Sequence, residues 1–150
     1  MIRKTAREIV MRLCFAVSAG GDNADALLDG FFNREYYTSL SDEDEVYAQY
    51  PDDASRAYIT AAVKGIGAHS AELDSYIEKY AVGWKFSRIS RTALAIMKTA
   101  MYEIMYMPDI PVGVSVNEAV ELAKKYDGDE TAAFINGILG SFARKELAEA

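Results

Sequence analysis

Apolar residues recur along this chain with the spacing of amphipathic helices. In the first segment they stand at Ala6, Ile9, Val10, Leu13, Cys14 and Val17. Because these positions lie three or four residues apart, they share one face of a helix, which Gly20-Gly21 is expected to end. The same spacing predicts a second helix over residues 24–36. It also predicts a third helix from about Ile59, with a break near residues 67–70 and a continuing apolar stripe beyond it.

Residues that stop or start helices punctuate the C-terminal half. A long helix is predicted from about Ser87 to Met107, where Pro108 stops it because proline lacks the amide hydrogen that a helix interior needs. The following loop leads to Ser115, which has the spacing of a capping box with Glu118. In that motif each side chain accepts a hydrogen bond from a free backbone amide. We therefore expect the next helix to begin at Ser115.

The last helix is expected to follow Asp127-Gly128, with Asp129 as its cap. Gly137 and Gly140 lie inside this predicted helix. Glycine weakens a helix because it leaves the backbone more freedom to lose on folding. We therefore expect neighbouring helices to cross closely at these two glycines.

No stretch of useful length alternates between apolar and polar residues, which is the pattern of a strand. Residues 38–53 are expected to form a loop, since they are acidic and contain Pro51. The predicted fold class is all-α, with six or seven helices. The chain has 150 residues, of which 51% are hydrophobic, and this length suits a single domain over residues 1–150 with a sizeable core.

The N-terminus has basic residues followed by an apolar stretch, as a secretory signal does. Glu8 and Arg12 interrupt that stretch, however, and no small-residue cleavage pattern follows it. No apolar run is long enough to cross a bilayer. The single cysteine excludes an internal disulfide framework and fits a reducing compartment. We therefore expect a cytoplasmic protein with no membrane partner.

Charge is unevenly distributed along a chain whose formal net charge is −7. Residues 1–12 hold four bases and one acid, residues 79–98 hold five bases and no acid, and residues 41–53 hold six acids and no base. Such runs are often solvated faces. The net negative charge argues against nucleic-acid binding by the whole surface, but a local basic patch would still attract phosphates. The acidic remainder would then limit indiscriminate RNA binding.

Catalytic chemistry has little support in the sequence. Cys14 lies on an apolar helix face and is expected to fill the core, and His69 lies near a helix break, where a cap or surface role is expected. Two such residues cannot supply the usual ligand count of a zinc site. The stretch "DGDETAAF" is similar to a calcium loop but lacks its turn glycine and closing glutamate. No phosphate loop or dinucleotide fingerprint occurs, so we expect no enzyme activity, metal or cofactor.

Four stretches of the chain resemble the NusB family of bacterial transcription antitermination factors. They are "RKTARE" at the start, "GWKFSRI" at 83–89, "AMYEI" at 100–104 and "DIPVGVSVNEAVELAKKYDGDETAAFINGILG" at 109–140. The resemblance runs through nearly the whole chain in family order, and residues 33–56 are its least recognisable part.

The resemblance implies a fold of about seven helices in two packed helical bundles. It implies binding to the boxA element of nascent ribosomal RNA transcripts, together with the ribosomal protein NusE. The pair helps an elongating RNA polymerase, within an antitermination complex, to resist termination. The family is not enzymatic.

The resemblance also assigns RNA-binding residues. The family's arginine-rich head falls on Arg3, Lys4 and Arg7, Lys98 occupies a typically basic position, and Phe134 matches an aromatic that lies near the RNA. The chain departs from the family in two ways. Its head has fewer arginines than that of many relatives, and Ala93 and Leu94 stand where many have an Asp-Arg pair. The second departure puts in doubt any polar contact that the pair would make.

Two other functions stay open on the sequence. One is a helical protein-interaction module or homodimer that binds no RNA, in which case the basic head is only a helix start. The other is the NusB-like RNA-binding head of an RNA methyltransferase, which needs a following catalytic domain. A native C-terminus at Ala150 would exclude that second alternative.

Overall fold

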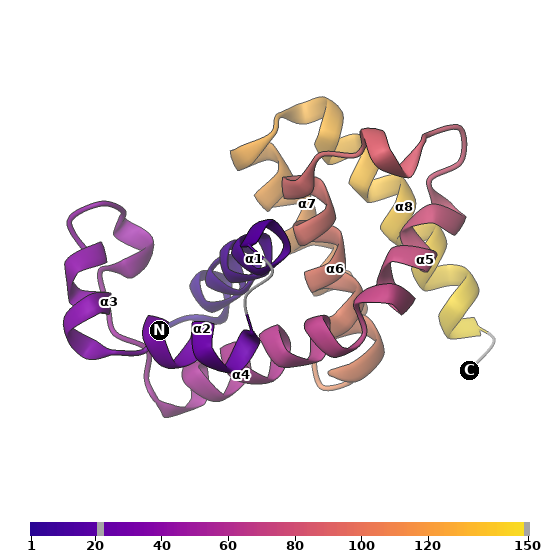
Figure 1. Ribbon diagram of the computed structural model, residues 1–150. Helices are drawn as coiled ribbons and strands as arrows, with labels where there is room; N and C mark the ends of the chain where they lie inside the picture. Colours follow the sequence, from indigo (N-terminus) through magenta and orange to yellow (C-terminus); the bar gives the residue numbers. More distant parts are fainter. Residues whose placement is uncertain (21–22, 149–150) are drawn as a thin grey trace. The chain divides into compact units, whose positions relative to one another are not determined.

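The computed structural model describes residues 1–20 and 23–148, and in these ranges every regular element is a helix (Figure 1). Eight α-helices and two short 3-10 helices are found there. The predicted all-α class is confirmed, with slightly more helices than expected. The chain divides into two compact units, Met1–Gly67 and Ala68–Ala150, and that the two form one domain stays a prediction.

The first unit is built around a long N-terminal helix. Its elements are α1 (Arg3–Gly20), α2 (Ala24–Phe31), α3 (Arg34–Leu40), the 3-10 helix η1 (Glu45–Tyr47) and α4 (Asp53–Ala68). The helix α1 carries the predicted apolar stripe and ends at Gly20, while Gly21 lies outside the described residues. Ile9 and Val10 are fully buried, and Cys14 is buried as expected of a core residue.

The predicted helix over residues 24–36 is in fact two helices. Asn33 caps the second of them, because its side chain accepts a hydrogen bond from the backbone amide of Tyr36 at 3.0 Å. The predicted loop from residue 38 is also partly wrong, since α3 continues to Leu40 and the Asp44 carboxylate caps η1. The cap at Asn33 therefore starts a new helix, although the apolar spacing continues across it.

An aromatic cluster fixes the chain between α3 and α4. Tyr37 is 1% exposed, and its hydroxyl donates to the carbonyl of Gln49 at 2.9 Å. The Tyr37 ring makes edge contacts with Phe31, Tyr47 and Tyr50. Burial raises the pKa of the Tyr37 hydroxyl to about 12. These contacts hold the acidic segment against the aromatic side chains of the first unit.

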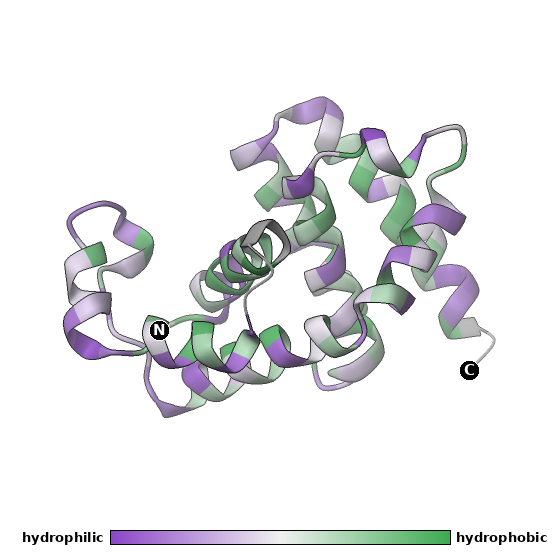
Figure 2. Ribbon diagram, in the orientation of Figure 1, coloured by the Kyte–Doolittle hydropathy of each residue, from purple (hydrophilic) through white to green (hydrophobic). Residues whose placement is uncertain are grey.

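The second unit packs four longer helices. Its elements are α5 (Ser70–Tyr80), the 3-10 helix η2 (Phe86–Arg88), α6 (Arg91–Tyr106), α7 (Val112–Tyr126) and α8 (Asp129–Ala148). The helix α8 packs against the other three, and Figure 2 shows it as hydrophobic in its middle and hydrophilic toward its C-terminal end. Met97, Met101, Ile135, Leu139 and Phe142 are fully buried in this core.

Two predicted helix boundaries move in this unit. The helix expected from Ser87 begins at Arg91 instead, because Ser90 caps it by accepting a hydrogen bond from the amide of Ala93 at 3.1 Å. The helix α6 ends at Tyr106, next to the predicted stop at Pro108. The break predicted near residues 67–70 is confirmed, since His69 occupies the N-cap position of α5.

The predicted capping box at Ser115 is wrong. The helix α7 begins at Val112, after Pro111, and Ser115 is fully buried inside it. Its hydroxyl donates a hydrogen bond of 2.7 Å to Glu103, a carboxylate of α6 that is also fully buried. A buried carboxylate needs donors to replace the water that it has lost, so this long-range contact determined the position of Ser115.

The expected close helix crossing at the α8 glycines is also wrong. A methyl group added at Gly137 would meet no atom within 4 Å, and one added at Gly140 would meet only the flexible end of Arg144 at 3.3 Å. Gly83 and Gly128 are different, because their φ angles of +84° and +98° favour glycine. Gly128 ends α7 in this way, and Asp129 is the first residue of α8 and not its cap.

Candidate nucleic-acid interface

The start of α1 presents two exposed cations. Arg3 and Lys4 are both exposed, and the Arg3 guanidinium lies 4.2 Å from the centre of the Tyr58 ring in α4. A cation over an aromatic ring at an exposed site contributes about 0.5–1 kcal/mol. This contact holds the Arg3 charge at the surface without neutralising it, so the charge is available to a phosphate.

Arg7, the third predicted residue of the head, has a different environment. It is only 3% exposed, and the neighbouring Glu8 is 7% exposed. A charged group at such depth requires polar partners inside the protein. The structure therefore separates Arg7 from the two exposed cations, and a direct contact of Arg7 with RNA stays a prediction.

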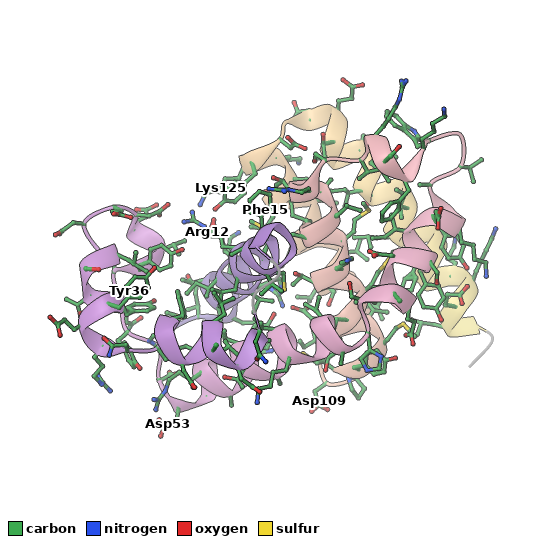
Figure 3. All side chains as sticks on the ribbon, viewed as in Figure 1. Arg12, Phe15, Tyr36, Asp53, Asp109 and Lys125 are labelled. Atoms are coloured by element: carbon green, nitrogen blue, oxygen red, sulfur yellow. The ribbon has the colours of Figure 1, made fainter. Side chains whose placement is uncertain are left out.

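Arg12, which Figure 3 labels, connects α1 to the acidic segment. Its guanidinium donates to the Asp44 carboxylate at 2.7 Å and to the Tyr47 hydroxyl at 3.4 Å. It also lies 5.4 Å from the centre of the Tyr47 ring. Two segments of opposite charge in the sequence therefore meet inside the first unit, and Arg12 serves the fold.

Lys98 is a partly buried cation with an internal partner. Its side chain is 14% exposed, and its Nζ lies 2.6 Å from Oδ1 of Asp74 and 3.0 Å from the Ser70 hydroxyl. These contacts connect α6 to α5. The ion pair reduces the charge that Lys98 can offer to a phosphate, and its predicted role toward RNA is untested.

Phe134 lies on α8 against Trp84, an aromatic residue that was not predicted to bind RNA. The centres of the Phe134 and Trp84 rings are 4.8 Å apart, with 57° between the ring planes. Trp84 is 54% exposed, although tryptophan usually buries most of its large surface. The only tryptophan of the chain thus stands at the surface beside a predicted RNA-binding aromatic.

A cleft of about 180 Å³ opens beside these two rings. Trp84, Ala93 and Phe134 line it, and so do the charged side chains of Arg88 and Glu130. Ala93, one of the two positions at which the sequence was expected to depart from the family, is 2% exposed. At that position the cleft therefore has an apolar wall.

Lys85, Arg88 and Arg91 are exposed basic residues. They lie within a few positions of cleft-lining residues in the sequence, and Arg88 itself lines the cleft. The sequence had shown a run of five bases over residues 79–98. The structure divides that run, because Lys79 pairs with Glu146 at 3.1 Å and Lys98 pairs with Asp74. The bases in the middle of the run are thus the ones that remain at the surface.

Across residues 1–20 and 23–148, no three His, Cys, Asp or Glu side chains come together as a metal site would require. In the same part of the chain, no helix combines the length and the apolar character needed to cross a membrane.

Known proteins resemble this chain over its full length. The family model described as the NusB family matches residues 4–144. The transcription antitermination protein NusB of Acetivibrio thermocellus is 40% identical over 150 residues, which cover all of this chain and 94% of that protein. The protein of the same name from Agathobacter rectalis is 41% identical and covers 95% of this chain and 100% of its own length.

Solved structures share the fold. NusB of T. maritima has a TM-score of 0.72 and 25% identity, and the match covers 100% of this chain and 99% of that one. A structure of the antitermination factors NusB and NusE in complex with double-stranded RNA has a TM-score of 0.74 at 20% identity, over 96% and 98% of the two chains. Because the family model matches residues 4–144 and a relative is 40% identical over the whole chain, this chain belongs to the NusB family.

Proposed function

We propose that this protein is a transcription antitermination factor that binds boxA-type RNA of nascent ribosomal RNA transcripts together with the ribosomal protein NusE. Family membership over residues 4–144 carries the proposal, with relatives named transcription antitermination protein that match nearly their full length. A protein of this family has been solved with NusE and double-stranded RNA. The protein is a transcription factor and not an enzyme, and we place its action in the cytoplasm, on the growing transcript.

The charges of the first unit support this function physically. Arg3 and Lys4 are exposed in the first turn of α1, where positive charge opposes the helix dipole at a cost of about 0.3–1 kcal/mol each. Exposed positive charge at a position that the helix dipole disfavours supports phosphate binding, because phosphates attract Lys and Arg.

The small number of exposed cations explains the need for a partner. The body of the protein is acidic, and Arg12 and Lys98 are engaged in internal ion pairs. Few phosphate contacts then give weak RNA binding by the isolated chain. NusE would add contacts of its own and tighten the complex.

A transcription assay tests the function. RNA polymerase is run through a terminator placed after a boxA-containing ribosomal leader, with NusE and the other elongation factors present and this protein added or omitted. Increased read-through that disappears when boxA is scrambled is the expected result. Equal read-through with and without this protein would refute the proposal.

A further inference from the structure

We propose that the cleft beside Trp84 takes one unpaired RNA base, stacked on the indole ring, while Arg88 and Lys85 hold the adjoining phosphates. The proposal rests on the RNA-binding function above and extends it to a site outside the basic head. It adds Trp84 to the residues predicted to contact RNA, which include Phe134.

The aromatic wall provides the first part of the argument. The indole ring contacts the Phe134 ring at a tilt of 57°, with 4.8 Å between the ring centres, and 54% of Trp84 remains exposed. Exposed aromatic side chains serve as platforms on which single-stranded bases stack, because every base has a π face. A cleft of about 180 Å³ next to this platform gives an inserted base a place to lie.

The backbone holds the platform in place. Gly83 adopts a φ of +84°, and the amide of Trp84 donates to the carbonyl of Ala81 at 3.1 Å. After this turn, the amide of Arg88 donates to the carbonyl of Lys85 at 2.9 Å. The segment passes beside α8 in Figure 1. Because these bonds fix the segment before any ligand arrives, binding loses little conformational entropy in it.

The charges decide which part of a nucleotide enters the cleft. Asp127 and Glu130 line it together with Arg88, and Oδ2 of Asp127 accepts a hydrogen bond from the Ser90 hydroxyl at 3.1 Å. Two carboxylates repel a phosphate, but they accept hydrogen bonds from the amino groups of a base. The base therefore points inward, and the phosphates stay outside.

The rim supplies the positive charge that the phosphates need. Arg88 and Lys85 are exposed, and neither forms an ion pair with another side chain in the part of the chain that the structure describes. Lys79 and Lys98, at the two ends of the same basic run, are both paired with carboxylates. The cations that keep their charge for a ligand are thus those next to the platform.

The fluorescence of the only tryptophan reports directly on this site. The full chain is titrated with single-stranded boxA-type RNA, with NusE present, while the anisotropy of a dye on the RNA measures total binding. We expect a change in Trp84 fluorescence that saturates together with the anisotropy. Inorganic phosphate at the same ionic strength is expected to leave the fluorescence unchanged. If the NusE used contains tryptophan, a version with phenylalanine at those positions is substituted.

Variants give the second measurement. Trp84→Ala is expected to weaken RNA binding by roughly 5- to 150-fold, the value of one stacked base, and Trp84→Phe is expected to restore most of the loss. Tyr36→Ala is the matched control, because Tyr36 is an aromatic residue of the first unit with a similar exposure of 51%. Circular dichroism verifies that each variant is folded.

The outcomes separate this proposal from the function on which it rests. If the RNA binds by anisotropy while Trp84 fluorescence is constant and Trp84→Ala binds as tightly as the parent, the base site is refuted and the function stands. If phosphate alone changes the fluorescence as RNA does, the inward orientation of the base is refuted. If no RNA binds even with NusE, the proposed function fails, and the base site fails with it.

Discussion

Removing the two exposed cations of the head, Arg3 and Lys4, tests whether they bind phosphate. In the double variant Arg3→Ala, Lys4→Ala, two phosphate contacts are lost. For a single-stranded nucleic acid each contact contributes about 0.7 to the slope of log K against log salt. The slope should therefore become shallower by about 1.4. RNA affinity at low salt should fall for boxA-type and scrambled RNA alike, since phosphate contacts do not depend on sequence.

The fold should tolerate this change. The variant loses the contact of Arg3 with the Tyr58 ring, worth about 0.5–1 kcal/mol, and it removes two cations that oppose the dipole of α1. These effects are of similar size and opposite sign. The free energy of unfolding should change by less than about 1 kcal/mol, which is a shift of a few degrees in Tm for a chain of this length.

Arg34→Ala is the matched control for this experiment. Arg34 also begins a helix, is also exposed, and its guanidinium lies 4.1 Å from the centre of the Tyr50 ring. It should therefore reproduce the effect of Arg3 on stability without an effect on the salt slope. Binding at several salt concentrations and thermal melts are measured for both variants. An unchanged affinity and slope in the double variant would refute the role of the head.

Three further predictions concern the fold and its pH dependence. Ser115→Ala should lower the free energy of unfolding by about 1–3 kcal/mol, because it removes a hydrogen-bond donor from the buried Glu103. The loss is measured by urea titration, with Ser39→Ala, at an exposed serine, as the control. A loss no larger than that of the control would show that Glu103 does not need this hydroxyl. Gly137→Ala should stabilise the protein by about 0.5–1 kcal/mol, since a methyl group there meets no neighbour, and a lower Tm would mean that the site is more crowded than described. The pKa of Tyr37, about 12, lies above the ordinary value of 10.0, so the contribution of the neutral hydroxyl to stability is complete below pH 10 and is lost as the pH rises toward 12. In thermal melts over this range, the Tm of Tyr37→Phe should fall less than that of the parent. An equal fall in Tm would contradict the effect of burial on this pKa.

The sequence predicted the helices best where one face of a helix is continuously apolar. The stripe of α1 is such a case, since Ile9 and Val10 are fully buried as their spacing required. The stop near Pro108 and the break near His69 were also predictable, because both depend on local backbone chemistry. These features are local, and a single sequence contains the information that determines them.

The errors arose where a distant partner decides the outcome. Ser115 has a perfect local capping spacing, but a buried carboxylate twelve positions earlier in the sequence takes its hydroxyl. The spacing could not show that Glu103 is buried. Gly137 was expected at a helix crossing. Nothing in the sequence indicated that a methyl group added there would meet no atom within 4 Å.

The candidate site was predictable in part. The exposed positions of Arg3 and Lys4 follow from their place at the start of an amphipathic helix. The burial of Arg7 and the ion pair of Lys98 with Asp74 depend on tertiary packing. Trp84 belongs to the stretch "GWKFSRI" that resembles the family, and a lone tryptophan among basic residues is a signal that marks it. Its contact with Phe134, fifty residues later, was not visible in the sequence.

The central claim is that this protein binds boxA-type RNA jointly with NusE, and one titration tests it most directly. Labelled boxA-type RNA and a scrambled RNA of the same composition are each titrated with the full chain, with and without NusE. We predict weak binding by the chain alone and clearly tighter binding of boxA-type RNA when NusE is present, with less gain for the scrambled RNA. Equal affinity for the two RNAs, unchanged by NusE, would contradict the account.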